Sequence, residues 1–339
     1  MLIRAKAPLR VSFSGGGTDV PPFPQREGGC VLNATINRYA YGTLRPRQDR
    51  QICIESLDFG VSVHYSIEDK PLYDGKLDLV KAAIVKLGGK DSTGFDLFLH
   101  SDAPPGSGLG ASSAMMVALV GLLKEFRGLP LTDYEIADLA YVIERKELGI
   151  QGGLQDQYAA AFGGFNYMEF LPDHVVVNPL KISSDVINEL QYNLLLCFTG
   201  RSRLSAGIIE DQVTRYEKQE EQTLQALREL KRLTVEMKNA LLRRCLDDFG
   251  ALLHEEWEYK KKMSSKISNS ELDALYETAR RYGAIGGKIS GAGGGGYMLL
   301  YCPYDRKHKV QEKLTELGCT ITDSAFEPSG LQVWRVNHG

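Results

Sequence analysis

The feature that most constrains this chain is a glycine-rich loop that runs directly into an apolar helix. Residues 104–114 read PPGSGLGASSA, and residues 111–126 are apolar nearly all round, so a helix there must be buried. Glycines let backbone N–H groups converge on an anion, and a helix start adds unpaired donors and a favourable dipole. Serine hydroxyls in the first turn can cap the helix or reach a metal. The loop therefore predicts a phosphate site, the alternative being a tight strand-to-helix turn with serine caps.

Two common nucleotide-binding motifs do not account for the glycines. A dinucleotide-binding fingerprint needs G-x-G-x-x-G directly after a strand, with an acidic residue about 20 positions later. Here Gly106, Gly108 and Gly110 follow two prolines, and the positions that should be acidic are apolar or basic. A Walker A loop needs G-x-x-x-x-G-K-[ST]. Lys288 comes one residue too early for that motif and is followed by Ile289.

Two further glycine-rich segments lie on either side of this loop in the sequence. Residues 286–296 hold seven glycines in eleven positions, just before an apolar strand at 297–301. Ordering so many glycines is entropically unfavourable, which indicates a close approach to the backbone; the alternative is a flexible linker. Residues 8–19, PLRVSFSGGGTD, place Arg10 on a strand and Asp19 after a glycine turn. Taken alone, such an aspartate is a turn-capping residue more often than a ligand.

The apolar pattern and the turn signals predict a mixed α+β chain. Strands are expected at 3–13, 31–44, 51–56, 61–67, 95–100, 192–198, 297–301 and 331–336, and helices at 77–87, 111–126, 132–147, 154–162, 217–244, 270–282 and 305–317. They occur in blocks without strict β-α-β alternation, which is typical of α+β folds. The length and a change of character near residue 180 predict two domains, 1–180 and 181–339.

Composition excludes several classes of function. With 40 Lys and Arg against 43 Asp and Glu, the net charge is −3, which gives no basic footprint for nucleic acid or an anionic membrane. No window approaches the roughly 18 apolar residues of a membrane span, and the N-terminus has no apolar signal region. The six scattered cysteines favour reduced thiols over a disulfide framework or a zinc site. A cytoplasmic protein with a small-molecule substrate is expected.

In their order along the chain, the three glycine loops resemble the motifs of the GHMP kinase superfamily, which includes galactokinase, homoserine kinase, mevalonate kinase and phosphomevalonate kinase. The segments FSGGGTD, VLNATINRYA and GGLQDQYAAAFGGFN look most like the D-glycero-D-manno-heptose 7-phosphate kinases. The resemblance covers most of the chain. It implies an N-terminal domain like ribosomal protein S5 domain 2, a ferredoxin-like C-terminal domain, an active site between them, and ATP and Mg²⁺ as cofactors.

The resemblance implies two catalytic residues. Asp156, in the sequence GLQDQ, matches the aspartate that acts as the base in the sugar kinases of this superfamily. A carboxylate there can accept or orient the proton of the attacking hydroxyl; the alternative is a helix cap. Arg10 matches the basic residue of the N-terminal motif, where a cation can hold Asp156 ionised and stabilise charge on the transferring phosphoryl group.

The resemblance also implies a magnesium site. In the superfamily the metal is held by a serine of the central motif and by a glutamate upstream of the base. Ser112 and Glu144 match these positions, with Ser113 and Glu147 as alternatives. Oxygen ligands together with ATP phosphates and water are what Mg²⁺ prefers. The other reading of such a glutamate is a solvent-facing helix carboxylate.

The remaining implied contacts are with the nucleotide and the acceptor. ATP is expected at the central loop, on Pro105, Gly106, Ser107, Gly108, Leu109, Gly110, Ala111, Ser112 and Ser113. The acceptor is expected at the other two loops, on Gly16, Gly17, Thr18, Asp19, Gly291 and Gly293. An acceptor that already carries a phosphate needs cations, and Arg201 and Arg203, on a loop after a strand, suit that group, although surface arginines are common.

One departure bears on the substrate. Galactokinase has Glu-His where this chain has Gly16 and Gly17, which argues against galactose and leaves room for a larger sugar. The sequence therefore predicts an ATP-dependent kinase that phosphorylates the anomeric C1 hydroxyl of a heptose 7-phosphate. The alternatives are a kinase of the same fold for another sugar such as fucose, a catalytically silent sugar or nucleotide sensor, and an ATP-dependent decarboxylase, against which the GLQDQ context argues.

Overall fold

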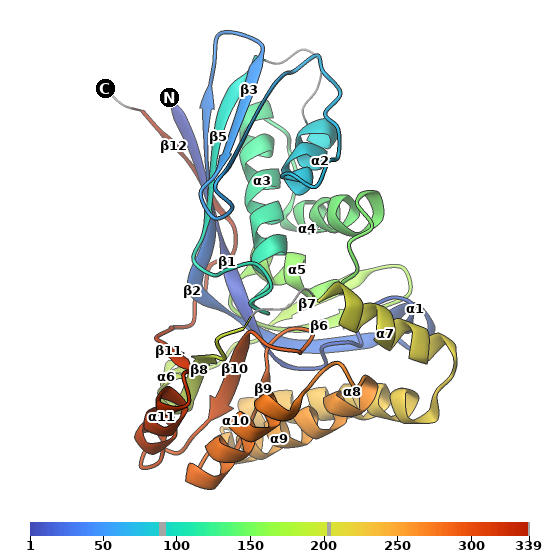
Figure 1. The fold of residues 1–339 in the computed structure, drawn as a ribbon, viewed down its shortest axis with the longest axis vertical. Helices are drawn as coiled ribbons and strands as arrows, with labels where there is room; N and C mark the ends of the chain where they lie inside the picture. The colour runs from blue at the N-terminus through green and yellow to red at the C-terminus, as the bar shows by residue number, and fades with distance from the viewer. Residues whose placement is uncertain (88–92, 202–204, 338–339) are drawn as a thin grey trace.

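A computed structural model describes residues 1–87, 93–201 and 205–337, which fold around two sheets (Figure 1). The larger sheet has the order β12-β1-β2-β5-β3-β4, and β6 and β7 extend it beside β2. Its neighbours are antiparallel except β3 and β5, which are parallel. Its strands are β1 (Leu2–Ser14), β2 (Gly29–Pro46), β3 (Gln51–Ser56), β4 (Val61–Ser66), β5 (Phe95–Ser101), β6 (Phe165–Phe170), β7 (Val175–Pro179) and β12 (Gln332–Val336).

The predicted apolar helix, α3 (Ala111–Arg127), packs on β1 and β2 at the centre of this half. Gly42 on β2 leaves the room that Leu122 fills, since a Cβ at Gly42 would lie 2.5 Å from the Leu122 Cδ1. Around α3 lie α2 (Asp78–Leu87), α4 (Asp133–Tyr141), a π-helical turn η1 (Val142–Glu147) and α5 (Gln155–Phe162). Helix α4 begins with a capping box, in which Thr132 and Glu135 exchange both cap hydrogen bonds.

The smaller sheet is antiparallel throughout, with the order β11-β8-β10-β9. Its strands are β8 (Leu194–Phe198), β9 (Gly286–Ile289), β10 (Tyr297–Tyr301) and β11 (Thr320–Thr322). The helices of this half are α6 (Ser184–Asn193), α7 (Ala206–Glu217), α8 (Glu221–Leu242), α9 (Leu246–Met263), α10 (Ser270–Tyr282) and α11 (Lys307–Glu316), and a short helix α1 (Phe23–Glu27) packs near α7.

Both ends of the described chain meet in the larger sheet, where β12 pairs with β1 (Figure 1). The expected boundary near residue 180 falls between β7 and α6, and one later strand therefore returns to the first half. The division into 1–180 and 181–339 stays a prediction.

Three predicted elements differ from the structure. The expected strand at 192–198 begins at Leu194, because the two residues before it complete α6. The helix expected at 217–244 is the shorter α8, which begins only at Glu221 because the chain turns at Gln219, where φ is 56°, after the end of α7. The helix expected at 132–147 becomes π-helical from Val142 onward.

The third glycine segment begins as a strand, whereas the sequence indicates a loop over all of 286–296. Its first four residues form β9, which lies between β10 and helix α9. A Cβ at Gly286 would lie 2.0 Å from the backbone oxygen of Gly250 on α9. The first glycines of this segment are therefore required by helix-on-strand packing, and only the residues after Ile289 form the loop.

Candidate active site

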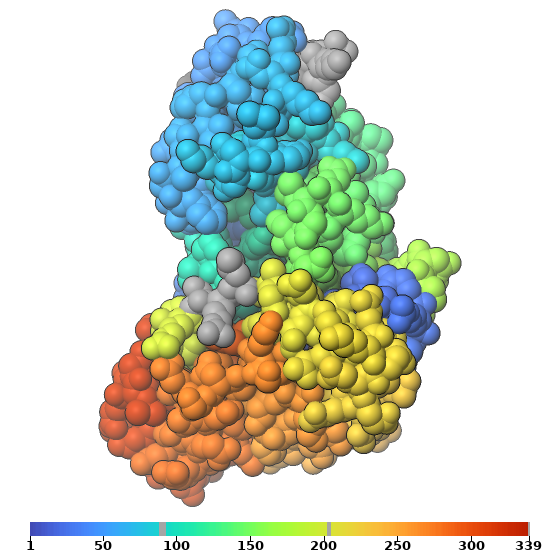
Figure 2. Space-filling model, turned by 45° about the vertical axis from the view of Figure 1, so that its right-hand side comes forward, coloured from blue at the N-terminus to red at the C-terminus, as the bar shows by residue number. Residues whose placement is uncertain are grey.

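All three glycine-rich segments border one cleft of about 600 Å³ between the two halves of the molecule. Figure 2 shows the surface hollowed where the N-terminal half meets the yellow helices of the C-terminal half. Clefts of this volume are typical of small-ligand sites. Most of the residues that the sequence analysis predicts for the site line this cleft. They are Arg10, Gly16, Gly17, Asp19, Pro105, Gly106, Ser107, Gly108, Gly110, Ala111, Ser112, Ser113, Glu144, Asp156, Gly291 and Gly293.

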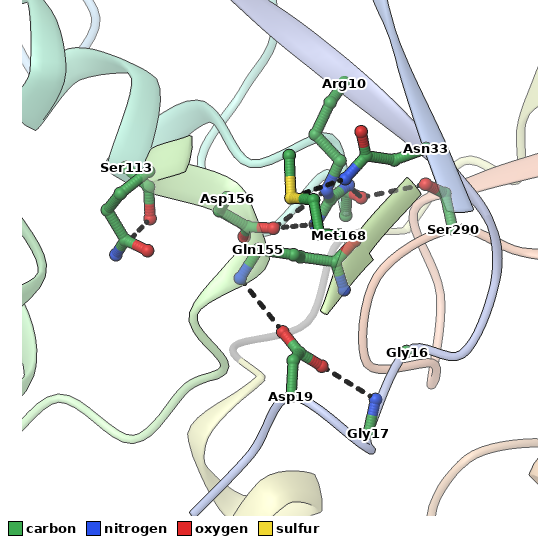
Figure 3. A network of polar contacts seen from close by, with 12 residues as sticks. Arg10, Gly16, Gly17, Asp19, Asn33, Ser113, Gln155, Asp156, Met168 and Ser290 are labelled. Carbon is green, nitrogen blue, oxygen red and sulfur yellow. Dashed lines mark hydrogen bonds and ion pairs between the residues drawn. The ribbon is translucent and has the colours of Figure 1, made fainter. Parts of the chain in front are cut away.

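Arg10 and Asp156, which both line the cleft, form an ion pair (Figure 3). The guanidinium Nη2 lies 2.7 Å and Nε 2.8 Å from Asp156 Oδ1, so both donors meet one carboxylate oxygen. A third donor, Nη1, reaches the backbone oxygen of Gly108 at 2.5 Å. Strand β1 supplies the arginine and the first turn of α5 supplies the aspartate. The Arg10 side chain is 5% exposed and that of Asp156 19%, so the carboxylate is the open member of the pair.

The central loop and the third glycine loop lie against each other. The Ser290 hydroxyl donates to the Gly108 oxygen at 3.0 Å, and the Tyr297 N–H donates to the Ser107 oxygen at 3.0 Å. A Cβ at Gly108 would lie 2.3 Å from the Ser290 oxygen, and one at Gly296 would lie 2.3 Å from the Ser107 oxygen. Backbone contact between the loops therefore accounts for these glycines. Leu109, which the resemblance includes among the ATP contacts, is buried in the core and does not line the cleft.

Two serines of α3 hold the buried carboxylate of Glu144. Ser112 Oγ donates to Oε1 at 2.8 Å and Ser113 Oγ donates to Oε2 at 2.7 Å. The Gln157 amide also donates to Oε2, at 2.6 Å. Glu144 is 1% exposed, whereas the alternative, Glu147, pairs with Lys86 outside the cleft. The structure thus brings together the two residues to which the resemblance assigns a metal.

Asp19 docks the N-terminal loop onto the start of α5 (Figure 3). Its two carboxylate oxygens accept the N–H of Gly17 at 3.0 Å and the N–H of Gln155 at 3.1 Å. A Cβ at Gly153 would lie 2.0 Å from Asp19 Oδ2, so the glycine there allows the approach. Thr18 does not line the cleft. The residue is fully buried, and its hydroxyl instead donates to backbone oxygens within and beside the loop.

The two arginines expected to bind an acceptor phosphate are only partly described. Arg203 lies outside the described residues. Arg201 accepts the Gly296 N–H on its backbone oxygen at 2.7 Å, which places its segment beside the third glycine loop. Its guanidinium is 74% exposed, pairs with Glu271 at 2.9 Å and is not among the groups that line the cleft.

Sequence reasoning missed several charged residues that line the cleft, and the most deeply buried of them is Lys260 on α9. Its Nζ lies 3.5 Å from the Gly16 oxygen, and the residue is 3% exposed. Burial lowers the pKa of this lysine to about 7, helped by the nearby cations of Lys288 and Arg10 and opposed by Glu256 and Asp19. The residue belongs to a run of three lysines, KKK at 260–262, which has no feature that singles out its buried member.

Comparison with known proteins decides the family. The model of the GHMP kinases N terminal domain matches residues 78–164, and that of the GHMP kinases C terminal domain matches residues 237–318. A D-glycero-alpha-D-manno-heptose 7-phosphate kinase from Campylobacter jejuni is 40% identical over 98% of this chain and 99% of its own length. The chain is a GHMP kinase. The predicted two-domain fold class is confirmed, and the protein is an ATP-dependent phosphotransferase.

Solved structures agree with this assignment. A D-glycero-D-manno-heptose 1-phosphate kinase from Bacteroides thetaiotaomicron superposes on the kinase with a TM-score of 0.84 at 36% identity, over 99% of this chain and 100% of that one. A putative sugar kinase from Campylobacter jejuni gives 0.81 at 39% identity, over 99% and 98% of the two chains. A Lactococcus lactis galactokinase shares the fold, with a TM-score of 0.76 at 20% identity.

Among the described helices of the kinase, none is both long enough and apolar enough to cross a membrane.

Proposed function

We propose that this kinase transfers the γ-phosphate of ATP to the anomeric C1 hydroxyl of D-glycero-D-manno-heptose 7-phosphate. The product is the 1,7-bisphosphate, a step toward a nucleotide-activated heptose. The observation that carries the proposal is the Arg10–Asp156 pair, which lies in the cleft directly beside the phosphate loop. The 40% identity to a heptose 7-phosphate kinase supports the choice of acceptor.

In the proposed reaction, the acceptor oxygen attacks the γ-phosphorus while its proton passes to Asp156, and the bond from that phosphorus to the bridging oxygen of ADP breaks. Asp156 suits this role because its carboxylate is the more open partner of the pair and is fixed through Oδ1. The fixed cation of Arg10 can stabilise the charge that spreads over the transferring group. In this proposal the N–H groups of the central loop and of the start of α3 bind the ATP phosphates, as the unpaired donors of a helix N-terminus favour.

Mg²⁺ fits the buried group on α3 and η1. A carboxylate and two hydroxyls, Glu144 with Ser112 and Ser113, are hard oxygen donors within one hydrogen bond of each other. Ser112 lines the cleft and is exposed there, so it can face a nucleotide phosphate. Ser112 and Glu144 would hold the ion, and bound Mg²⁺ would neutralise the charge of the ATP phosphates.

We assign the 7-phosphate to the segment that carries Arg201 and Arg203. Its support is the hydrogen bond that ties the Arg201 backbone to Gly296, at the edge of the loop that borders the cleft. The Arg201 side chain is exposed, and its only ion pair with a described residue is the surface pair with Glu271. Such pairs are weak in water, so the side chain can turn toward an anion.

Six scattered cysteines with no disulfide among the described residues favour the reducing cytoplasm.

A second candidate acceptor is fucose. A bifunctional fucokinase/GDP-fucose pyrophosphorylase from Arabidopsis thaliana is 30% identical over 98% of this chain, although the match spans only 32% of that protein. The names of two relatives also differ in the position of the phosphate on the sugar. The C. jejuni protein is called a heptose 7-phosphate kinase and the B. thetaiotaomicron protein a heptose 1-phosphate kinase.

ADP release by the purified protein with Mg-ATP separates these candidates. The acceptors are mannoheptose 7-phosphate, sedoheptulose 7-phosphate, mannose 6-phosphate, galactose and fucose, and Asp156→Asn is the inactive control. We expect turnover only on mannoheptose 7-phosphate. Arg201→Ala with Arg203→Ala should raise its KM and leave the KM of ATP unchanged. If the protein turns over free fucose, and still does so with Arg201→Ala and Arg203→Ala, fucose is the acceptor and the proposed heptose phosphate is not. ATP binding without turnover on any of the sugars would favour a silent sensor.

A further inference from the structure

A buried lysine without a carboxylate partner borders the cleft beside the first glycine loop. Lys260 forms no ion pair with any described residue, and the bond that it donates to the Gly16 oxygen is long at 3.5 Å. An ammonium group that is removed from water is costly unless it is paired and hydrogen-bonded. Its three donors are therefore largely unused in the protein alone, and the group lines a cavity that can admit a ligand.

Two further polar groups beside Lys260 also lack partners. A Cβ at Gly16 would lie 3.1 Å from Lys260 Nζ, 3.5 Å from Gln155 Nε2 and 3.6 Å from Ser12 Oγ. The Ser12 hydroxyl and the Gln155 Oε1 are buried and make no hydrogen bond with any described residue. Buried polar groups in folded proteins are nearly always hydrogen-bonded. Of these groups, Lys260 and Gln155 line the cleft together with Gly16, whose missing side chain leaves them uncovered, and Ser12 lies beside them.

The charges around this space are nearly balanced. Behind Lys260, the ammonium of Lys288 on β9 pairs with Glu256 on α9 at 2.7 Å, and both side chains are fully buried. Asp19 from the first loop and Arg10 from β1 also act on Lys260. With Lys260 itself there are three cations, Lys260, Lys288 and Arg10. They are matched by three carboxylates, Glu256, Asp19 and the Asp156 that pairs with Arg10. The site therefore offers donors and acceptors together, with no surplus of positive charge that would attract a dianion.

This chemistry selects the kind of group that binds. A fully ionised phosphate only accepts hydrogen bonds, and here it would lie near the Asp19 carboxylate, which repels it. A sugar hydroxyl both donates and accepts, so it can pair with an amine, an amide oxygen and a serine hydroxyl. We propose that Lys260 and Gln155, with Ser12 beside them, form a subsite for the hydroxyl groups of the acceptor sugar, in which Lys260 is a specificity-determining residue. The inference rests on the proposed function, because it places the sugar ring of that acceptor.

The test compares Lys260→Met with Lys262→Met, which changes an exposed lysine two positions along the same helix. Binding of mannoheptose 7-phosphate and of Mg-ADP is measured by calorimetry, and KM and kcat by ADP release. Lys260→Met should weaken acceptor binding and raise the acceptor KM by about tenfold or more, since a charge-assisted hydrogen bond is lost. Mg-ADP binding and the ATP KM should stay within about twofold of wild type, as in Lys262→Met.

The pH dependence gives a readout that a purely structural role would not move. The charged amine is the stronger donor, and the pKa of Lys260 is about 7. Acceptor affinity of the wild type should therefore be higher below pH 7 and fall as pH rises through it. In Lys260→Met this step should disappear, whatever other groups contribute to the profile.

Gly16→Ala is the second variant, in case Lys260→Met does not fold. Its methyl group would fill the space in front of Lys260 and should also raise the acceptor KM. Acceptor affinity within about twofold of wild type in a folded Lys260→Met or Gly16→Ala, with an unchanged pH step, overturns the subsite. A wild-type kinase that binds another sugar and not mannoheptose 7-phosphate overturns the proposed acceptor instead, and the two failures are thereby distinguished.

Discussion

The two neighbouring parts of the cleft differ in how completely their polar groups are satisfied. Around Asp156 and Glu144, each charged or hydroxyl side chain of the candidate catalytic set already has a partner within 2.9 Å. Around Gly16, an amine, a hydroxyl and an amide oxygen are buried with weak or no partners among the described residues. The first part holds reacting groups in place before any ligand arrives, as electrostatic catalysis requires. The second part leaves its hydrogen bonds for the acceptor.

The largest expected effect is on kcat, at the part of the cleft around Asp156 and Glu144, where the polar groups already have partners. Asp156→Asn keeps the shape of the side chain and removes its charge, so it should lower kcat by about 10²–10⁴-fold, the usual contribution of a general base. Calorimetric binding of Mg-ADP should be nearly unchanged. The comparison fails if the variant loses acceptor binding and keeps its kcat, because Asp156 would then belong to the binding part.

Glu144→Gln should give the next largest effect. The carboxylate is buried with Ser112, Ser113 and Gln157, and its neutral replacement removes the anionic ligand proposed for magnesium. The Mg²⁺ concentration for half-maximal activity should rise by at least about tenfold. Glu147→Gln is the matched control, since it breaks only a partly exposed pair with Lys86, worth about 0–1 kcal/mol. Equal responses of the two variants would remove the metal role from Glu144.

The contact between the glycine loops predicts a smaller effect, on stability. Gly108 and Gly75 have nearly equal φ, +82° and +83°, yet only Gly108 faces another backbone, with the Ser290 oxygen 2.3 Å from its missing Cβ. Alanine at either site carries the strain of a positive φ. Gly108→Ala should lower the free energy of unfolding by about 1–3 kcal/mol more than Gly75→Ala. Urea titration measures both, and equal losses would show that the loops do not constrain each other.

The smallest expected effect is a gain in stability when Lys260 is replaced, at the part of the cleft around Gly16, where polar groups lack partners. The pKa of Lys260 falls from 10.5 to about 7 on folding, so the folded state binds fewer protons than the unfolded state between these values. Burial of the charged amine therefore destabilises the kinase fully below pH 7, and this loss disappears as pH rises toward 10.5. Lys260→Met should raise the melting temperature by roughly 2–4 °C or more at pH 7, and by less at pH 9.5. A lower melting temperature at both pH values would make Lys260 a structural residue.

Sequence reasoning succeeds best where a feature depends on a local motif. The central loop and the helix that it opens follow from residues within one short segment, and the resemblance of short motifs to the superfamily supplies Arg10, Asp156 and Glu144 as candidates. The structure adds the long-range contact, since Arg10 and Asp156 meet across 146 positions of the chain.

The parts that sequence reasoning missed depend on packing between distant segments. The sequence pattern does not predict helix α9, because many of its residues are charged although one of its faces is buried against β9. Without that helix, nothing distinguishes Lys260 from Lys261 and Lys262 beside it. For the same reason, the sequence indicates a loop at Gly286. The structure shows that a glycine is needed there because the backbone of α9 packs directly against it.

Phosphorus NMR of the product formed from Mg-ATP and mannoheptose 7-phosphate tests the central claim most directly. If Asp156 activates the anomeric hydroxyl, a second phosphate signal should appear beside that of the 7-phosphate, with coupling to the anomeric proton. The signal should be absent with Asp156→Asn and formed at a reduced rate at low acceptor concentration with Lys260→Met. A new phosphate on another carbon, or full product formation by Asp156→Asn, would contradict the account.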